Sequence, residues 1–406
     1  MLLQAGRLLS TAGTSLTSIA YPLLALAVTH SAAKAGLVAF VRLAPFGLFS
    51  LAAGVAADRW SRRRLMIASD AVRVPAIGTL AALVITDSAG LTAILVVAFI
   101  EGTAATFFVG AEPGAMRAVV PATQLPAAAG AQEARRAVVM LGGPPLGGAL
   151  YGLSRAVPFV VDAASYLFST LSLLAMRTPF QEARSPDVAP LRARIAEGFH
   201  FMWDHAFLRT TAFLYAIGNV LVPAMLLVVV VVGRREGLSP GAIGALTAAV
   251  GAGVLVGSLA SPLFRRRFSV RTILLLELWT WLGSWAFVVW PHAYALAAAL
   301  AVFGFAAPIT DSVVVGYRLA ITPDSLVGRV ESVRTTISLL VTPLGPLAAG
   351  LLLEATSARA TVALFAAAGL ALALWGTLSP SIRQAPSLNE LGSLAPEQAS
   401  AAPRGI

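Results

Sequence analysis

The sequence predicts an all-α membrane protein with twelve transmembrane helices arranged in two pseudo-symmetric six-helix bundles. Three observations lead to this prediction. Of the 406 residues, 58% are hydrophobic and only 12% are charged, against about 25% charged in a typical soluble domain. The apolar residues form twelve runs of about twenty residues, the length that crosses a bilayer. The two halves of the chain also repeat the same local features.

The first apolar runs in the chain frame a strongly basic connection, Arg59–Arg64, which cannot lie in hydrocarbon. The spans that follow from the hydropathy lie near 7–29, 35–56, 65–86, 90–110, 131–152, 158–177, 207–232, 241–264, 271–290, 293–314, 333–354 and 360–379. With this topology, 23 of the 29 basic residues fall on the side of the Arg59–Arg64 connection. By the positive-inside rule that side is the cytoplasm, so we expect both termini there and the protein in the cytoplasmic (inner) membrane.

The stretch between the sixth and seventh spans, residues 178–206, is polar and predicts a cytoplasmic linker. Its second part, Leu191–Trp203, carries apolar residues at helical spacing and predicts an amphipathic helix on the membrane surface. The linker separates a first bundle, 1–177, from a second, 207–379. Residues 380–406 are rich in Ser, Ala, Pro and Gln, which predicts a disordered tail.

The charge and composition exclude several classes of function. The net charge is +10, but the basic residues lie in short loops between apolar runs, so we expect a lipid bilayer and no nucleic acid as partner. The chain has no cysteine, which excludes disulfides, thiolate nucleophiles and sulfur-ligated metals. Its histidines lack ligand spacing, so we expect no metal site. No catalytic cluster is visible, and we expect no enzyme.

The two halves have similar sequence features in the fifth span of each half, which are spans five and eleven of the chain. Gly142–Gly148 is a Gly/Pro cluster in span five, and Pro343–Pro346 is its counterpart in span eleven. Glycines allow close helix approach, while prolines bend a helix. Two related six-span halves predict a substrate site between the bundles near the membrane midplane, and rocking of one bundle against the other.

Two motifs carry a family resemblance. Gly54-x3-Asp58-Arg59-x2-Arg62-Arg63 resembles the signature loop of the major facilitator superfamily, and Gly143-Pro144-x-Leu146-Gly147-Gly148 resembles the Gly-Pro motif of its drug–proton antiporter branch. Other sequence segments, such as Phe159–Ala163, are similar to those of twelve-span exporters related to macrolide-efflux and enterobactin-export proteins. The resemblance covers nearly the whole chain.

The resemblance implies a conformational latch that closes the cytoplasmic side. Asp58 is expected to meet the positive N-terminus of span eleven, and Arg59 and Arg62 are expected to find acidic partners in Glu112 and Asp70. The residues assigned to the latch are Gly54, Asp58, Arg59, Arg62, Arg63 and Glu112. The Gly-Pro motif comprises Gly143, Pro144, Gly147 and Gly148. The alternatives are a topology determinant for the charges and a simple packing kink for the motif.

Charges inside spans are functional candidates because each is costly there. Glu101 lies near the middle of span four and is the best candidate for a proton carrier or a cationic-substrate contact. Arg42, Asp162 and Asp311 are the further candidates, with capping or interface pairing as the alternative for the two aspartates. Exporters of the resembled subgroup carry an acid in span one after Ser-x2-Gly, where this chain has Thr14.

These features predict a secondary active transporter that exports small amphipathic or lipophilic compounds, such as drugs, macrolides or siderophore-like molecules, by alternating access. Proton antiport is expected to drive it, so the partners are a small-molecule substrate and protons, with no cofactor. We expect a monomer. The alternative is an uptake symporter or facilitative carrier of the same fold, which the missing span-one acid keeps open. A non-transporting membrane sensor is a third, less favoured class.

Overall fold

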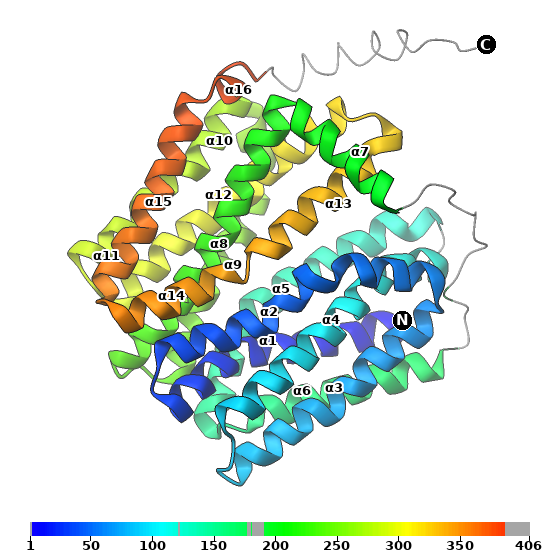
Figure 1. The fold of residues 1–406 in the computed structure, drawn as a ribbon, viewed down its shortest axis with the longest axis vertical. Helices are drawn as coiled ribbons and strands as arrows, with labels where there is room; N and C mark the ends of the chain where they lie inside the picture. The colour runs from blue at the N-terminus through cyan, green and yellow to red at the C-terminus, as the bar shows by residue number, and fades with distance from the viewer. Residues whose placement is uncertain (1, 121, 177–179, 181–190, 386–406) are drawn as a thin grey trace.

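The structure, a computed structural model, describes residues 2–120, 122–176, 180 and 191–385. Their regular secondary structure is entirely helical, with no strand among them (Figure 1). The helices are α1 (Leu2–Thr29), α2 (Ala32–Arg59), α3 (Arg62–Ile85), α4 (Leu91–Val119), α5 (Leu125–Leu153), α6 (Val157–Ala175), α7 (Leu191–Asp204), α8 (Ala206–Arg235), α9 (Pro240–Arg267), α10 (Val270–Trp279), α11 (Trp285–Val289), α12 (Ala293–Ile321), α13 (Asp324–Val341), α14 (Leu344–Ala355), α15 (Ala358–Leu378) and α16 (Pro380–Arg383).

Over the described residues the twelve predicted spans coincide with helices, which confirms the all-α membrane fold. Among the described residues, 11 helices are long and apolar enough to cross a membrane, and in α5 the apolar stretch Ala137–Leu153 adds a shorter one. Two predicted spans are interrupted. The ninth is divided by a 3-10 segment, Thr280–Ser284, between α10 and α11, and the eleventh is divided between α13 and α14 at Pro343.

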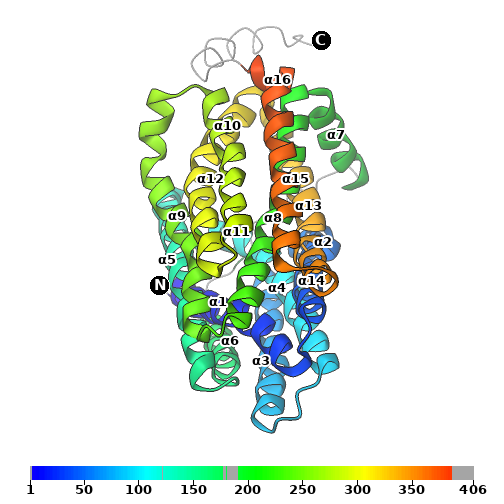
Figure 2. The same ribbon diagram turned by 90° about the vertical axis from the view of Figure 1, so that its left-hand side faces the viewer.

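The helices pack in two groups, α1–α6 and α8–α15, which lie on opposite sides of the molecule in Figure 1. The linker helix α7 packs on α13, where Glu197 pairs with Arg329 and Gly198 lies against the Arg329 backbone (Figure 2). The first residues of the predicted tail form α16, and residues 386–406 lie outside the described part of the chain.

Glycine contacts join the two groups between α5 and α9. A Cβ atom at Gly148 would collide with the carbonyl oxygen of Pro240, and one at Gly244 would collide with that of Pro144. Further along α9 from Gly244, Gly251 lies against Met140 of α5. The absence of side chains at these glycines therefore lets the two helix backbones touch.

The contact between α2 and α14 is the counterpart of the α5–α9 contact when the two halves of the chain are compared. A Cβ at Gly36 would collide with the Pro346 carbonyl oxygen, and one at Gly350 would lie 2.6 Å from the carbonyl oxygen of Ala32. The partner helices within each group match too, because Gly147 packs α5 on α1 and Gly345 packs α14 on α8. The Gly/Pro helices α5 and α14 thus have equivalent positions in the two halves.

Both contacts involve the same end of the bundle, where α5 finishes and α9 begins, and where α2 begins and α14 finishes. This end carries few basic residues, among them Lys34 and Arg155. At the opposite end of α2 the side chain of Asp58 is 76% exposed. The molecule is therefore closed between its halves at the end poor in basic residues.

The contact at this end can be tested by disulfide formation, since the chain has no cysteine of its own. A Cβ built on Gly241 lies 3.8 Å from the Cβ of Ala149, the usual separation in a disulfide. We expect Ala149→Cys/Gly241→Cys to cross-link under mild oxidation, as judged by a mobility shift after cleavage between the halves. Adding Gly148→Leu should slow this reaction several-fold, because the side chain forces α5 from α9.

The matched control is Gly283→Cys/Ala299→Cys, whose Cβ atoms lie 3.5 Å apart within the second group. Its cross-linking should not respond to Gly148→Leu. Equal rates of the first pair with and without Gly148→Leu would contradict the packing described here.

Candidate substrate cavity and buried charge network

A cavity of about 330 Å³ lies between the two groups of helices. The first group contributes α1, α2 and α5, with Tyr21, Arg42 and Pro144 in the wall, and the second contributes α8, α9 and α14, with Pro223 and Pro346. The lining is mainly apolar, with a small number of polar groups, which is the usual make-up of a site for a small molecule. Arg42 is the charged residue in the lining of this cavity.

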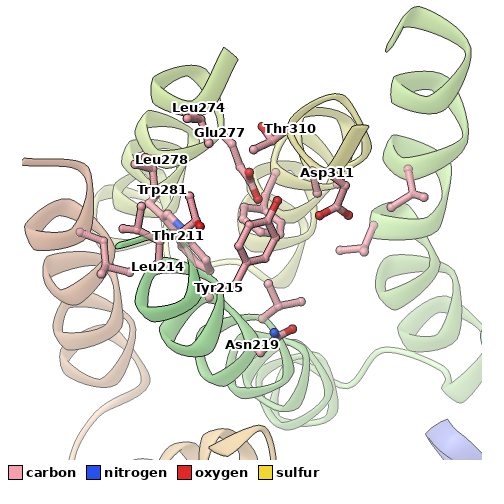
Figure 3. Close-up of a pocket in the computed structure, with 18 of the residues that line it drawn as sticks. Thr211, Leu214, Tyr215, Asn219, Leu274, Glu277, Leu278, Trp281, Thr310 and Asp311 are labelled. Atoms are coloured by element: carbon pink, nitrogen blue, oxygen red, sulfur yellow. The ribbon is translucent and has the colours of Figure 1, made fainter. Parts of the chain in front are cut away.

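A second cavity, of about 590 Å³, is lined almost entirely by the second group of helices. Met140 of α5 is its lining residue from the first group. Both cavities are lined by Met140, Pro223 and Val250. Figure 3 shows the side chains of Tyr215, Glu277 and Asp311 pointing into the same space, with Trp281 and Asn219 at its edge. The two cavities are therefore neighbours, with Arg42 in the lining of the first and Glu277, Asp311 and Arg334 in the lining of the second.

Arg42 and Glu101 form a two-point ion pair in the wall of the first cavity. Arg42 Nε donates to Glu101 Oε2 at 2.7 Å, and a terminal nitrogen of Arg42 donates to Oε1 at 3.0 Å. The side chains are 14% and 2% exposed. The guanidinium also lies 4.9 Å from the ring centre of Tyr21, a favourable cation–π arrangement. The structure therefore places two of the predicted coupling residues, from α2 and α4, in direct contact.

Hydroxyl groups extend this ion pair toward Asp162. Thr17 donates to Asp162 Oδ2 at 2.9 Å and lies 3.5 Å from the Arg42 guanidinium. Tyr166 donates to Glu101 at 3.4 Å and shares a 2.7 Å hydrogen bond with Thr14. Asp162 is fully buried. It lies inside the first group of helices, where its hydroxyl partner Thr17 belongs to α1.

A further buried pair joins α3 to α6. Arg73 donates to Asp70 at 3.1 Å, and the Ser169 hydroxyl donates to the same carboxylate at 2.6 Å. The Arg73 guanidinium lies 4.9 Å from the ring centre of Tyr166. Asp70 therefore forms its ion pair with Arg73. Its predicted pairing with Arg59 or Arg62 is wrong in this structure.

Glu112 also has other partners than those predicted. Arg7 of α1 donates to both of its oxygens at 2.6 Å, and Arg135 of α5 lies 3.5 Å away. The prediction that Glu112 pairs with Arg59 or Arg62 is therefore wrong here. The reason is helix packing: Glu112 faces α1 and α5, whereas Arg59 ends α2 and is exposed.

The remaining residues of the signature motif form a compact turn between α2 and α3. Arg62 lies 3.9 Å from Asp58 and packs over Gly114. Arg63 donates to the carbonyl oxygens of Leu173 and Leu174 at 3.0 and 2.9 Å, and so caps the end of α6. Nothing lies within 4 Å of a Cβ built on Gly54. Asp58 does not touch the start of span eleven in this structure.

The Gly-Pro motif lies where three helices meet. Gly143 packs against Ser15 and Gly147 against Leu16, both on α1, while Gly148 and Pro144 face α9 of the other group. The motif thus lies at the junction between the halves.

Sequence reasoning missed the hydroxyl groups of Thr17 and Tyr166. A signal for the second was present, because Asp162, Tyr166 and Ser169 recur at helical spacing in an otherwise apolar span. All three are buried in the structure. A polar stripe of this kind in a membrane helix indicates an internal polar network.

The ion pair yields a prediction about stability. Glu101→Gln removes one partner and leaves a buried, uncompensated arginine, which costs about 3–5 kcal/mol. We expect a lower midpoint of thermal unfolding for the purified protein in detergent. Arg42→Gln/Glu101→Gln, which removes both charges, should recover much of the loss. The exposed Asp87→Asn serves as the control, and equal stability of the single and double variants would contradict the pair's role.

Comparison with known proteins agrees with this architecture. Residues 5–266 match the family model described as Major Facilitator Superfamily. The chain is 29% identical over 402 residues to the multidrug efflux pump Tap of Mycolicibacterium fortuitum, covering 94% of each chain. It is 28% identical over 421 residues to the protein of the same name from Mycobacterium tuberculosis, covering 96% of this chain and 94% of the relative.

Solved structures show the same fold at low identity. A bacterial homologue of the iron transporter ferroportin, in an inward-facing state, has a TM-score of 0.70 at 15% identity, with 93% of this chain and 97% of that one covered. The nucleoside transporter NupG gives 0.67 at 15% identity, with 95% and 100% covered. The fold, the junction between its halves and the family match agree that this chain is a multi-pass membrane transporter, not an enzyme, and belongs to the Major Facilitator Superfamily.

Proposed function

We propose that the chain exports small amphipathic or lipophilic compounds by proton antiport and alternating access. One observation carries the proposal. The cavity between the halves is bounded at one end by the matched contacts of α5 with α9 and α2 with α14, and its wall holds the buried Arg42–Glu101 pair. A carrier that alternates needs a reversible closure of this kind around a central site.

The direction of export follows from the distribution of charge. The closed end is poor in basic residues, so the positive-inside rule assigns it to the outside and both termini to the cytoplasm of a bacterial inner membrane. The state described here then receives substrate from the cytoplasm. The efflux pumps that resemble this chain over nearly their whole length support export.

The adjoining cavities support an amphipathic substrate. Their volumes of about 330 and 590 Å³ lie within the range of sites for drug-sized molecules. Trp281 and Tyr215 offer aromatic surface. The lining has two carboxyl groups, Glu277 and Asp311, against one arginine, Arg334, which favours a positively charged end.

Export is tested by measuring the accumulation of fluorescent and antibiotic compounds in cells that lack their own exporters. Cells that produce the protein should accumulate several-fold less of at least one compound, and a protonophore should abolish the difference. The control is Gly148→Leu, which obstructs the closed end and should restore accumulation at equal protein levels. A rise in accumulation would contradict export and favour the alternative, an uptake symporter or facilitative carrier.

The Asp58 latch belongs to the opposite state in this proposal. Here Asp58 is exposed, as expected while the cytoplasmic end is open. When that end closes, its carboxylate meets the N-terminus of span eleven, which attracts negative charge. Such a latch stabilises only the state that is closed to the cytoplasm.

Asp58→Asn should therefore shift the population toward the state described here. A carboxylate at a helix N-terminus contributes about 0.3–1 kcal/mol, which corresponds to a change of about two- to fivefold in the ratio of the states. We expect faster cross-linking of Ala149→Cys/Gly241→Cys when Asp58→Asn is added. Asp87→Asn, also an exposed aspartate, should have no effect. Slower cross-linking with Asp58→Asn would contradict the latch.

A further inference from the structure

Asp162 has an unusual position for a carboxyl group. Its exposed fraction is zero. Its side-chain oxygens meet only two groups among the described residues, the hydroxyls of Thr17 at 2.9 Å and Ser165 at 3.4 Å. No arginine, lysine or histidine nitrogen in that part of the chain lies within ion-pair distance of it. An ionised carboxylate in such a place is very costly.

The space around Asp162 is built for this side chain. Gly13 of α1 faces it, and a Cβ there would lie 2.5 Å from Asp162 Oδ1 and collide with the Ser165 hydroxyl. Only glycine leaves room for the carboxyl between α1 and α6. The carboxyl group therefore occupies a defined place in the packing of these helices.

The hydrogen bonds fit a protonated acid. The Ser165 hydroxyl donates to the backbone oxygen of Asp162 at 2.7 Å, which uses its single hydrogen. Its 3.4 Å contact with Oδ1 is then satisfied when the carboxyl group donates. Thr17 donates to the other oxygen, Oδ2, at 2.9 Å. Both oxygens of a neutral Asp162 thus find suitable partners.

Charge balance in the surrounding cluster leads to the same assignment. The charged and titratable groups that act on Asp162 are Glu101 from α4, Arg42 from α2, Arg73 from α3, Tyr21 from α1 and Tyr166 from α6. Arg73 is paired with Asp70, and Arg42 with Glu101. Each of these arginines thus already has a carboxylate partner, and neither of them lies within ion-pair distance of Asp162. A proton on Asp162 removes the cost of a buried charge without an ion-pair partner.

We propose that Asp162, and not Glu101, carries the exchanged proton, with Thr17 as its link to the cavity. This inference rests on the proposed antiport. Thr17 lies between Asp162 and Arg42, and Arg42 lines the cavity. In one cycle the O–H bond of Asp162 breaks and the proton passes to cytoplasmic water, while the carboxylate left behind takes up a proton from outside water. No oxidation or reduction is involved.

The occupancy of this proton can be observed without any substrate. Infrared difference spectra of the purified protein in detergent, titrated with pH, report the C=O stretch of protonated carboxyl groups. We expect a titrating band that is missing in Asp162→Asn and present in Arg42→Gln/Glu101→Gln and in Asp87→Asn. A spectrum of Asp162→Asn identical to that of the native protein, together with loss of the band when Glu101 is replaced, would overturn the inference.

A relocated acid provides the second measurement. Thr14 follows Gly13 and shares a hydrogen bond with Tyr166, so an acid at this position would reach the same cluster from α1. In proteoliposomes with ethidium as probe, Asp162→Asn should abolish the stimulation of transport by a pH gradient but preserve exchange of ethidium at equal pH. Thr14→Asp added to Asp162→Asn should restore the stimulation. Stimulation that survives in Asp162→Asn would overturn the inference.

The two measurements separate the proposals. A protein that moves no compound but retains the Asp162 band contradicts export, and shows only that Asp162 holds a titrating proton. A protein that exports ethidium under a pH gradient without the Asp162 band retains its function and loses this assignment.

Discussion

The positive charge of a buried arginine needs a negative partner close by, and in this chain Glu101 forms an ion pair with Arg42. The pair is held at two points in the wall of the central cavity, where a lone charge would be costly. Tyr166 and Thr17 complete its hydrogen bonds, and Asp162 lies next to it with hydroxyl partners only among the described residues. The first half of the molecule is therefore organised around charge balance.

The second constraint is close contact between backbones. Glycines in α5 and α9, and in α2 and α14, remove side chains at the end where the halves meet. The two contacts are equivalent by the internal symmetry, so one rotation of the halves would separate both. Small residues suit a contact that has to form and break, because little side-chain packing is lost. The Gly-Pro motif combines this contact with two prolines inside α5.

The sequence predicted the helices better than their partners. Hydropathy located the spans, and the cost of buried charge identified Glu101 and Arg42 as candidates without showing that they touch. The partner of Glu112 could not be predicted, because Arg7 is 105 residues away and meets it only through the packing of α1 on α4. The break at Pro343 has a visible cause in the sequence, whereas the 3-10 segment at Thr280–Ser284 contains no proline and gave no such signal. Neighbours across helices depend on three-dimensional packing, which the spacing within one helix does not encode.

The central claim is that substrate and protons move in opposite directions through one cavity. The most direct measurement uses proteoliposomes with a pH-sensitive dye inside and an ethidium gradient as the only driving force. If the account is right, ethidium entering down its gradient drives protons out, so the lumen becomes alkaline when the native protein is present and stays unchanged in empty liposomes. Ethidium entry without any change in pH would indicate a facilitative carrier, and acidification would indicate symport; either result would contradict the account.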